Sequence, residues 1–308
     1  MGRTAFLFPG QGSQAVGMCR DLYDAFSSVR DVFDKAESVT GLKLRELCFD
    51  GPMEALTETM NLQPALTAVN LACIAALREK SQVRADICAG HSLGEYAALY
   101  YAGVISFEDT FKLVLSRGRL MQREADLNPG KMSAVLRLKI DTVQQIVDKL
   151  KEQGVIAVAN HNSEKQIVIT GEPDLIKQAS KLVRENKGIS VPLNVSGAWH
   201  SDLIGNAQAE FCKILESIPF QEPEIPVLFN VTAEEQKNPK KIRKLMGRQF
   251  CMPVKWHDIM LAMIHKGVDT FVEIGPGTVL TGLILKTSSE NMKPKTYNVN
   301  SLESLSLF

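Results

Sequence analysis

The feature that most constrains the fold is an alternation of short apolar runs with longer segments of helical periodicity. Between the runs, apolar residues recur at three- and four-residue spacing, as on the buried face of a helix. Such alternation is typical of a parallel sheet whose strands are joined by helical crossovers. The expected strands are 5–8 and 86–89, and the expected helices are 53–59, 64–79, 93–102 and 107–125.

The rhythm changes at 126–131, where Asn128, Pro129 and Gly130 form a strong turn signal. After this turn the order is strand, helix, strand, strand, helix, strand, which is the ferredoxin-like pattern. From about residue 197 long helices and isolated strands return. The six expected elements of the middle segment are 132–138, 141–152, 155–159, 166–170, 173–186 and 189–193.

Two domains follow from this change of pattern. We predict a large α/β domain over 1–129 and 196–308, with a parallel sheet that includes a strand at 268–274. A small ferredoxin-like α+β domain over 130–195 is inserted into it. The polar tail after Lys286 is expected to wrap the surface.

The strongest local signal is the sequence Gly-His-Ser-Leu-Gly at 90–94, between an expected strand and an expected helix. This G-x-S-x-G pattern makes a tight turn that exposes the serine hydroxyl, and small flanking residues are needed for the turn to close. Ser92 is therefore the candidate nucleophile. The alternative is a glycine-bounded turn whose serine only caps the helix.

A nucleophilic serine needs a base, and the sequence offers five histidines. His200 lies in a loop of small residues before a helix and is the favoured candidate, although spacing alone leaves the others open. Arg117 lies 25 residues after Ser92, in the expected helix 107–125; it is either an exposed helix charge or a buried clamp for a substrate carboxylate. No histidine spacing is typical of a metal site, so no metal is expected.

The first loop, Pro-Gly-Gln-Gly-Ser-Gln at 9–14, resembles a dinucleotide-binding fingerprint. That fingerprint requires an acidic residue at the end of a second strand, and the segment 21–39 that holds Asp31 has a helical pattern instead. We interpret the loop as one that brings backbone N–H groups beside the nucleophile, as an oxyanion hole requires.

Composition excludes several classes of protein. The 308 residues hold 35 basic and 35 acidic side chains, so a nucleic-acid partner, which usually needs a basic surface, is not expected. The longest uncharged apolar stretch, 65–77, is too short to span a membrane, and no signal peptide is expected. Six widely spaced cysteines indicate reduced thiols in a cytoplasmic compartment. A monomer is expected.

Taken together, the motifs resemble the malonyl-CoA:acyl carrier protein transacylase family along nearly the whole chain. The resemblance implies a hydrolase-like parallel-sheet α/β domain with a ferredoxin-like insertion, and a coenzyme A thioester as substrate with no cofactor. The segments that carry it are FPGQGSQ at 8–14, LQPAL at 62–66, GHSLGEYAAL at 90–99, SRGRLMQ at 116–122, NHNSEKQIVITG at 160–171, GAWHS at 197–201, RQFCMPVKW at 248–256 and EIGPGTVLTGL at 273–283.

The resemblance also implies roles for individual residues. Ser92 attacks malonyl-CoA while His200 takes its proton, and a carrier-protein thiol then collects the malonyl group. The oxyanion is bound by the backbone N–H groups of Gln11 and Leu93, and Arg117 holds the malonyl carboxylate. Three further residues are matched to family positions: Gln249 to the carbonyl that orients the histidine, Gln63 to the pocket lining and Asn162 to the small-domain wall of the cleft.

One residue departs from the family pattern. Trp199 precedes the histidine where many members have phenylalanine or serine, so the ring either narrows the acyl pocket against branched malonyl groups or packs outward. The expected function is malonyl transfer to a carrier protein for fatty acid synthesis. The alternatives are a freestanding acyltransferase of a polyketide synthase, an acyl hydrolase and a non-catalytic carrier-binding module.

Net neutrality conceals a local concentration of charge. Six basic residues and no acidic one fall within 236–248, just before Gln249. This run is either a solvated helix face or a docking patch for an acidic carrier protein. The residues are Lys237, Lys240, Lys241, Arg243, Lys244 and Arg248.

Overall fold

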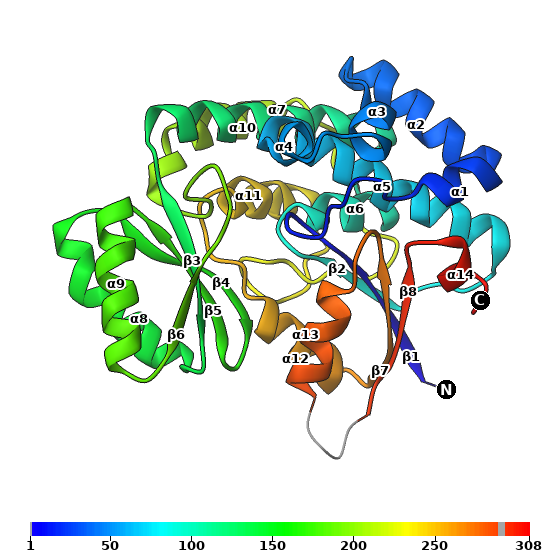
Figure 1. The fold of residues 1–308 in the computed structure, drawn as a ribbon. Helices are drawn as coiled ribbons and strands as arrows, with labels where there is room; N and C mark the ends of the chain where they lie inside the picture. The colour runs from blue at the N-terminus through cyan, green and yellow to red at the C-terminus, as the bar shows by residue number, and fades with distance from the viewer. Residues whose placement is uncertain (1, 289–292) are drawn as a thin grey trace.

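A computed structural model describes residues 2–288 and 293–308 and contains two four-stranded sheets (Figure 1). The first sheet has the strand order β2-β1-β7-β8, and all its neighbouring strands are parallel. This agrees with the parallel sheet predicted from the alternating pattern. Its strands are β1 (Arg3–Phe8), β2 (Ile87–Gly90), β7 (Val268–Ile274) and β8 (Lys295–Val299).

Both faces of this sheet are buried, which explains the continuous apolar run at the start of the chain. Phe6 and Phe8 point into a core formed with α5, α6 and α7, whereas Ala5 and Leu7 point into a second core formed with α12 and α13. The helices of this part are α1 (Arg20–Ala25), α2 (Ser27–Thr40), α3 (Leu44–Phe49), α4 (Met53–Thr57), α5 (Thr59–Lys80), α6 (Gly94–Tyr101), α7 (Phe107–Leu127), α10 (Asn206–Glu216), α11 (Pro239–Gln249), α12 (Trp256–His265), α13 (Val279–Thr287) and α14 (Leu302–Leu305), with the short 3-10 helix η2 (Asp202–Ile204).

The second sheet is antiparallel and has the strand order β4-β5-β3-β6. Two helices cover one of its faces and share a core with it that is separate from the other two. Figure 1 shows this layer beside the first sheet. Its elements in chain order are β3 (Lys131–Leu136), α8 (Ile140–Leu150), the 3-10 helix η1 (Lys151–Gln153), β4 (Ile156–Ser163), β5 (Gln166–Gly171), α9 (Pro173–Glu185) and β6 (Ile189–Pro192).

Two expectations about elements were wrong. The helix expected to begin at Pro64 begins at Thr59, so the proline lies inside α5. Its missing N–H costs one hydrogen bond, which the almost complete burial of the helix offsets. The tail after Lys286 was expected to wrap the surface, but residues 295–299 form β8 at the edge of the first sheet. A polar sequence suits an edge strand with one exposed side; residues 289–292 of the tail lie outside the described part.

Helix α5 is long and apolar enough to pass a composition test for a membrane span. However, 83% of its apolar window is buried inside the protein, between the sheet and the neighbouring helices. The core helix of a folded domain has the same composition, so the burial accounts for the apolar sequence.

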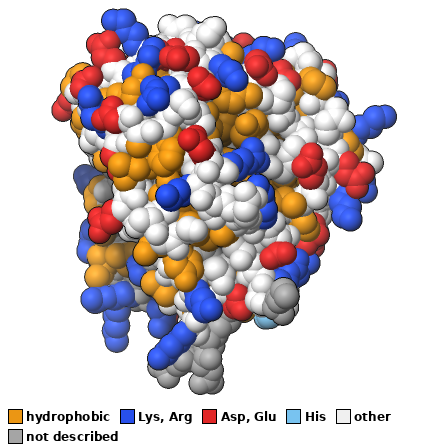
Figure 2. All heavy atoms as spheres, turned by 90° about the vertical axis from the view of Figure 1, so that its right-hand side faces the viewer, with side chains coloured by type: hydrophobic (Ala, Val, Ile, Leu, Met, Phe, Trp, Pro, Cys, Tyr) orange, Lys and Arg blue, Asp and Glu red, His pale blue; other side chains and the backbone are white. Residues whose placement is uncertain are grey.

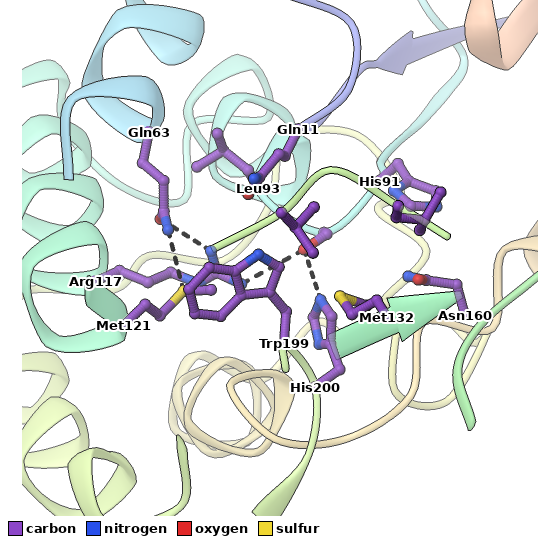
Figure 3. Close-up of a pocket in the computed structure, with 13 residues that line it drawn as sticks. Gln11, Gln63, His91, Leu93, Arg117, Met121, Met132, Asn160, Trp199 and His200 are labelled. Atoms are coloured by element: carbon purple, nitrogen blue, oxygen red, sulfur yellow. Dashed lines mark hydrogen bonds between the residues drawn. The ribbon is translucent and has the colours of Figure 1, made fainter. Parts of the chain in front are cut away.

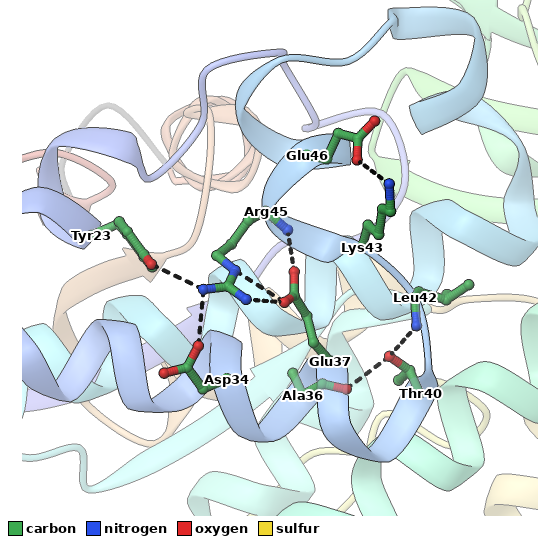
Figure 4. A network of polar contacts seen from close by, with 9 residues as sticks. All are labelled: Tyr23, Asp34, Ala36, Glu37, Thr40, Leu42, Lys43, Arg45 and Glu46. Carbon is green, nitrogen blue, oxygen red and sulfur yellow. Dashed lines mark hydrogen bonds and ion pairs between the residues drawn. The ribbon is translucent and has the colours of Figure 1, made fainter.

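Around α1 the helices are joined by polar contacts rather than by a catalytic arrangement (Figure 4). Arg45 of α3 donates to Glu37 and pairs with Asp34 at 3.0 Å, both on α2, and also donates to the hydroxyl of Tyr23 at 3.2 Å. Although burial opposes it, the bonds from Arg45 lower the pKa of Glu37. Figure 2 shows acidic and basic side chains interspersed over the neighbouring face, in keeping with the zero net charge.

Candidate active site

Ser92 lies in the turn between β2 and α6, where its backbone is left-handed with φ of 50°. A Cβ on Gly90 would lie 1.9 Å from the carbonyl carbon of Gly94, and a Cβ on Gly94 would lie 2.0 Å from the carbonyl oxygen of Phe8. Both positions therefore require glycine for β1, β2 and α6 to meet. The strained turn presents the serine hydroxyl at the end of the strand.

The hydroxyl of Ser92 is hydrogen-bonded to His200, with 2.7 Å between Oγ and Nε2. On the other side of the ring, Nδ1 lies 3.1 Å from the carbonyl oxygens of both Gln249 and Met252. Carbonyls only accept hydrogen bonds, so Nδ1 carries the proton and Nε2 is free to accept one from the serine. Sequence spacing left the base open, and the structure places His200 in that position.

The remaining histidines have other surroundings. His91 bonds through Nε2 to Oδ1 of Asn162 at 2.8 Å, and the rings of His161 and His257 lie 4.8 Å apart, between β4 and α12. His265 occupies the last turn of α12. Among the residues described, no three histidine, cysteine or acidic side chains are arranged to hold a metal ion.

His200 is buried beside a positive charge. Burial lowers its pKa to about 3, with further lowering by the charge of Arg117 and by His91. The ring is therefore neutral at neutral pH, which is the state a base needs before it accepts a proton.

Arg117 is an internal cation rather than an exposed helix charge, with only 1% of its surface accessible. Its Nη1 donates to Oε1 of Gln63 at 2.9 Å, and its Nη2 donates to Oε1 of Gln249 at 3.2 Å and to Oγ of Ser92 at 3.5 Å. Within the described part of the chain no carboxylate forms an ion pair with it, and its Nε has no partner. The buried carboxyl of Glu95 interacts with this charge from beyond ion-pair distance, and burial raises the pKa of that carboxyl to about 8, so the guanidinium is left to bind an external anion.

Two glutamines hold this guanidinium in place. Gln63 of α5 also donates from Nε2 to the hydroxyl of Thr59 at 3.1 Å. Gln249, at the end of α11, donates from Nε2 to the carbonyl oxygen of Ser92 at 2.7 Å, while its own carbonyl contacts His200. The family resemblance implies only the backbone carbonyl contact of Gln249; its side chain also joins the serine to the arginine.

The first loop meets the serine turn closely. A Cβ on Gly10 would lie 2.3 Å from the carbonyl oxygen of His91, so only glycine permits this approach. Gln11 and Leu93 both line the cavity beside Ser92. In the described ranges, neither backbone N–H donates a hydrogen bond, so both are available to a bound molecule.

These residues surround a cavity of about 90 Å³ (Figure 3). Since a single water needs about 10–15 Å³ by the same measure, the space suits a group of a few heavy atoms. Figure 3 shows Arg117 and Gln63 on one side and His200 on another. The lining residues are Gln11, Gln63, His91, Ser92, Leu93, Arg117, Met121, Met132, Asn160, Leu193, Val195, Trp199 and His200.

The structure places two further predicted site residues, Asn162 and Trp199. Asn162 faces His91, and it is Asn160, two residues earlier on β4, that lines the cavity. Trp199 lines the cavity and is 5% exposed. Its ring also packs on Gly197, where a Cβ would lie 2.7 Å from two ring atoms. The indole therefore forms part of the cavity wall instead of pointing outward.

Sequence reasoning missed Asn230, which braces the serine turn. Its Oδ1 accepts from the backbone N–H of Ser92 and its Nδ2 donates to the carbonyl oxygen of Gly90, both at 2.7 Å. Its own N–H donates to Oε1 of Glu95 at 2.8 Å, and burial raises the pKa of Glu95 to about 8. No motif marks a loop asparagine 138 residues from the serine it contacts.

Comparison with known proteins identifies the family of this chain. A family model for the acyl transferase domain matches residues 5–302. The chain is 38% identical to the malonyl CoA-acyl carrier protein transacylase of Bacillus subtilis (strain 168), over 100% of this chain and 96% of that protein.

Solved structures give the same result. The acyl carrier protein S-malonyltransferase of Vibrio cholerae O1 biovar eltor has a TM-score of 0.94 at 37% identity, and the match covers 99% of each chain. A malonyl-transacylase solved in complex with a type II PKS acyl-carrier protein has a TM-score of 0.94 at 36% identity, covering 98% of this chain and 97% of that one. The chain therefore belongs to the malonyl-CoA:acyl carrier protein transacylase family.

Proposed function

We propose that this protein transfers the malonyl group of malonyl-CoA to the phosphopantetheine thiol of an acyl carrier protein, through a malonyl ester on Ser92. One observation carries the proposal. The serine Oγ lies 2.7 Å from Nε2 of His200 and 3.5 Å from Nη2 of Arg117, a buried cation with no carboxylate partner in the described chain. The nucleophile, its base and an anion site thus meet in one cavity.

In the first half-reaction, the Oγ of Ser92 bonds to the thioester carbon while Nε2 of His200 accepts the hydroxyl proton. The carbonyl oxygen becomes an oxyanion, which accepts hydrogen bonds from the backbone N–H groups of Gln11 and Leu93. The intermediate collapses, the carbon–sulfur bond breaks, and the sulfur takes the proton from His200. Coenzyme A leaves as the free thiol.

The second half-reaction retraces these steps with a different thiol. The carrier thiol gives its proton to His200 as its sulfur bonds to the ester carbon. Collapse of the second oxyanion breaks the bond to Oγ of Ser92, and the proton returns to that oxygen. Backbone carbonyls at 3.1 Å hold the imidazole in the required tautomer, so no acidic partner is needed.

Arg117 selects the acyl group. A planar guanidinium binds a carboxylate through two parallel hydrogen bonds, and burial strengthens them because water does not compete. An uncharged acyl group would leave the cation unpaired, which disfavours the alternative of a hydrolase for ordinary acyl chains. The contacts of Gln63 and Gln249 orient the fork before the substrate arrives.

We regard 130–195 as a ferredoxin-like domain inserted into the hydrolase-like domain of 1–129 and 196–308. It has a core of its own, and Met132, Asn160 and Leu193 extend from it into the cavity lining. The small domain would then supply one wall of the acyl site while Ser92 and His200 come from the large one.

Other expectations remain proposals. The nucleophile, base and hydrogen-bond donors all come from the chain, so we propose that the coenzyme A thioester suffices without a cofactor. The six cysteines are free thiols in the structure, as suits a cytoplasmic protein, and we expect a monomer that binds no nucleic acid and no membrane. Fatty acid synthesis is the proposed pathway; the relative bound to a type II PKS carrier keeps polyketide synthesis as the second candidate.

Intact-mass measurement tests the function. Incubation with malonyl-CoA should add one malonyl group, which holo carrier protein should remove faster than water does. Ser92→Ala should gain no adduct. An adduct on that variant would remove Ser92 as nucleophile, and faster loss to water than to the carrier would favour the hydrolase. Transfer assays with a fatty acid carrier and a polyketide carrier would separate the two pathways.

A further inference from the structure

A basic groove lies at the turn between β4 and β5, with a volume of about 480 Å³. Its cations come from three separate parts of the chain: Arg137 follows β3, Lys165 lies in the β4–β5 turn, and Lys286 lies in the last turn of α13. The acidic residue in its lining, Glu164, is paired with Lys139 at 3.3 Å. Among the lining residues that the structure describes, three cations face one acid, so this part of the groove has a net positive charge. Ser163 and Gln166 add polar side chains.

The groove continues along the same strands as the acyl cavity. On β3, Met132 lines the cavity and Leu136 lines the groove. On β4 the corresponding residues are Asn160 and Ser163. Four residues of extended strand span about 13 Å at roughly 3.3 Å per residue.

The groove and the cavity also share one face of the second sheet. Val135 and Ile167, the neighbours of Leu136 and Gln166 along their strands, point to the opposite face, into the core with α8 and α9. Side chains alternate across a strand, so Leu136 faces the same way as Met132. Figure 1 shows α13, which carries Lys286, between this layer and the first sheet.

The cavity itself cannot hold the whole donor. It has room for an acyl group and its thioester. The one cation in its described lining is Arg117, which in the proposed function is already paired with the malonyl carboxylate. The phosphates of the donor must therefore lie outside it, at the far end of the pantetheine arm. That arm is a flexible chain, longer than the strand segment between cavity and groove, so its phosphate end can reach the groove.

Two other hollows suit phosphates less well. The hollow beside α11 is lined by Lys241, Lys244 and Arg248 but also by two acids, Glu234 and Glu235, of which Glu235 is paired with Lys266 at 2.9 Å. A third hollow, behind His200, has Lys151 paired with Asp148 at 2.7 Å and includes Asp202 in its lining. Acidic side chains at short range repel a phosphate, so the basic groove is the better anion site.

We propose that the basic groove of Arg137, Lys165 and Lys286 binds the phosphate groups at the far end of the pantetheine arm while the thioester lies beside Ser92. The proposal rests on the proposed function, because it takes a pantetheine thioester as the substrate. The phosphates belong either to coenzyme A or to the phosphopantetheine of a carrier protein. Both sources present the same chemistry to the groove.

The test removes the three charges and compares donors with and without phosphates. The groove variant carries Arg137→Gln, Lys165→Gln and Lys286→Gln together. The control carries Lys149→Gln, Lys177→Gln and Lys181→Gln, which removes the same charge from α8 and α9. Those helices pack on the opposite face of the second sheet from the groove. Each lost cation–phosphate contact should raise KM about two- to fivefold, since exposed ion pairs contribute up to about 1 kcal/mol. The KM of the groove variant for malonyl-CoA should therefore rise roughly tenfold to a hundredfold.

Malonyl-N-acetylcysteamine, a thioester without phosphates, is the decisive second donor. Its kcat/KM should be the same for wild type, groove variant and control. A separate assay measures the KM of holo carrier protein with malonyl-CoA saturating. If the groove variant raises the KM for malonyl-CoA alone, the groove binds coenzyme A. If it raises the KM for the carrier alone, the groove binds phosphopantetheine. If it raises both KM values, the two substrates share the site.

Two results would overturn the proposal. One is an unchanged KM for both phosphorylated substrates, and the other is an equal loss with malonyl-N-acetylcysteamine, which would indicate general damage. Failure of the proposed function looks different, because the wild type itself would then transfer malonyl from neither donor. The two failures are thus separated by the behaviour of the unmodified protein.

Discussion

Replacement of Arg117 by methionine should change which acyl group the enzyme accepts. The side chain is buried, its guanidinium is held by Gln63 and Gln249, and no carboxylate of the described chain neutralises it. Methionine fills a similar volume without charge or donors. Malonyl transfer should therefore lose the carboxylate contact, whereas acetyl transfer, which never used that contact, should be retained.

The structure sets the size of the effect. Hydrogen bonds to charged groups contribute about 1.5–3 kcal/mol each, so a two-pronged contact is worth about 3–6 kcal/mol. At about 1.4 kcal/mol per factor of ten, kcat/KM for malonyl-CoA should fall roughly 10²- to 10⁴-fold. Since the two glutamines already order the fork, little side-chain entropy opposes binding, and a loss of less than about a hundredfold is not expected.

The assay measures the acylation rate of Ser92 by rapid quench and intact mass, with malonyl-CoA and acetyl-CoA in parallel. The ratio of the two kcat/KM values is the quantity of interest, because a folding defect lowers both rates together. Arg117→Lys is the matched variant: it keeps a charge without the planar fork and should fall between wild type and Arg117→Met. A malonyl-to-acetyl ratio that stays within about threefold of wild type, far below the loss worked out from the hydrogen bonds, would refute the carboxylate clamp.

Three further predictions concern the base, the serine turn and the carrier. Because protonated His200 cannot accept the serine proton, acylation should persist as pH falls below 6.5 and be lost only as pH approaches the His200 pKa of about 3. In Arg117→Met the loss should begin at higher pH, since the charge of Arg117 is the second cause of the low pKa; coincident pH–rate profiles would contradict this. Asn230→Ala leaves the N–H of Ser92 and the carbonyl of Gly90 unpaired. The kcat should therefore fall about tenfold or more while the KM for malonyl-CoA stays unchanged. A change in KM alone would exclude a positioning role for Asn230. Reversal of two charges on α11, Lys241→Glu with Lys244→Glu, should raise the KM for carrier protein and leave that for malonyl-CoA unaffected; equal effects would reject a docking role for this helix.

The elements around Ser92 could be predicted from sequence because their causes are local. A buried parallel strand is a continuous apolar run, and the turn that follows it requires glycine on both sides of the serine. The antiparallel order of 131–192 also follows from local periodicity. The expected start of α5 at Pro64 was wrong because burial of the whole helix outweighed the preference of proline for a first turn.

The rest of the site depends on contacts between distant segments, which one sequence does not encode locally. Arg117 lies on an amphipathic helix, and nothing in its neighbours distinguishes a buried cation from a solvated one. His200 and Asn230 reach Ser92 from 108 and 138 residues away. The family resemblance implies the pairing of His200 with Ser92 but not that of Asn230 with Ser92. The contacts of Asn230 could therefore be found only from the folded structure.

The basic run of 236–248 shows that the distribution of charge in space also cannot be predicted from the order of residues along the chain. Arg243 folds back to donate to the carbonyl of Ile218 at 2.8 Å and lies over the ring of Phe220. Lys241, Lys244 and Arg248 share their hollow with Glu234 and Glu235, which precede the run in sequence. The segment is therefore less uniformly basic in space than along the chain, and its docking role remains a prediction.

The single serine and single imidazole of the acyl cavity determine the order in which substrates are handled. Ser92 carries one acyl group at a time, and His200 exchanges a proton with one thiol at a time. Coenzyme A must depart before the carrier enters, so the kinetics should be ping-pong, with each thiol competing for the same acylated form. Because the second half-reaction is the reverse of the first with a different thiol, the protein catalyses an exchange that runs in either direction. The ratio of malonyl-CoA to free coenzyme A, compared with that of malonyl-carrier to free carrier, decides which way malonyl flows.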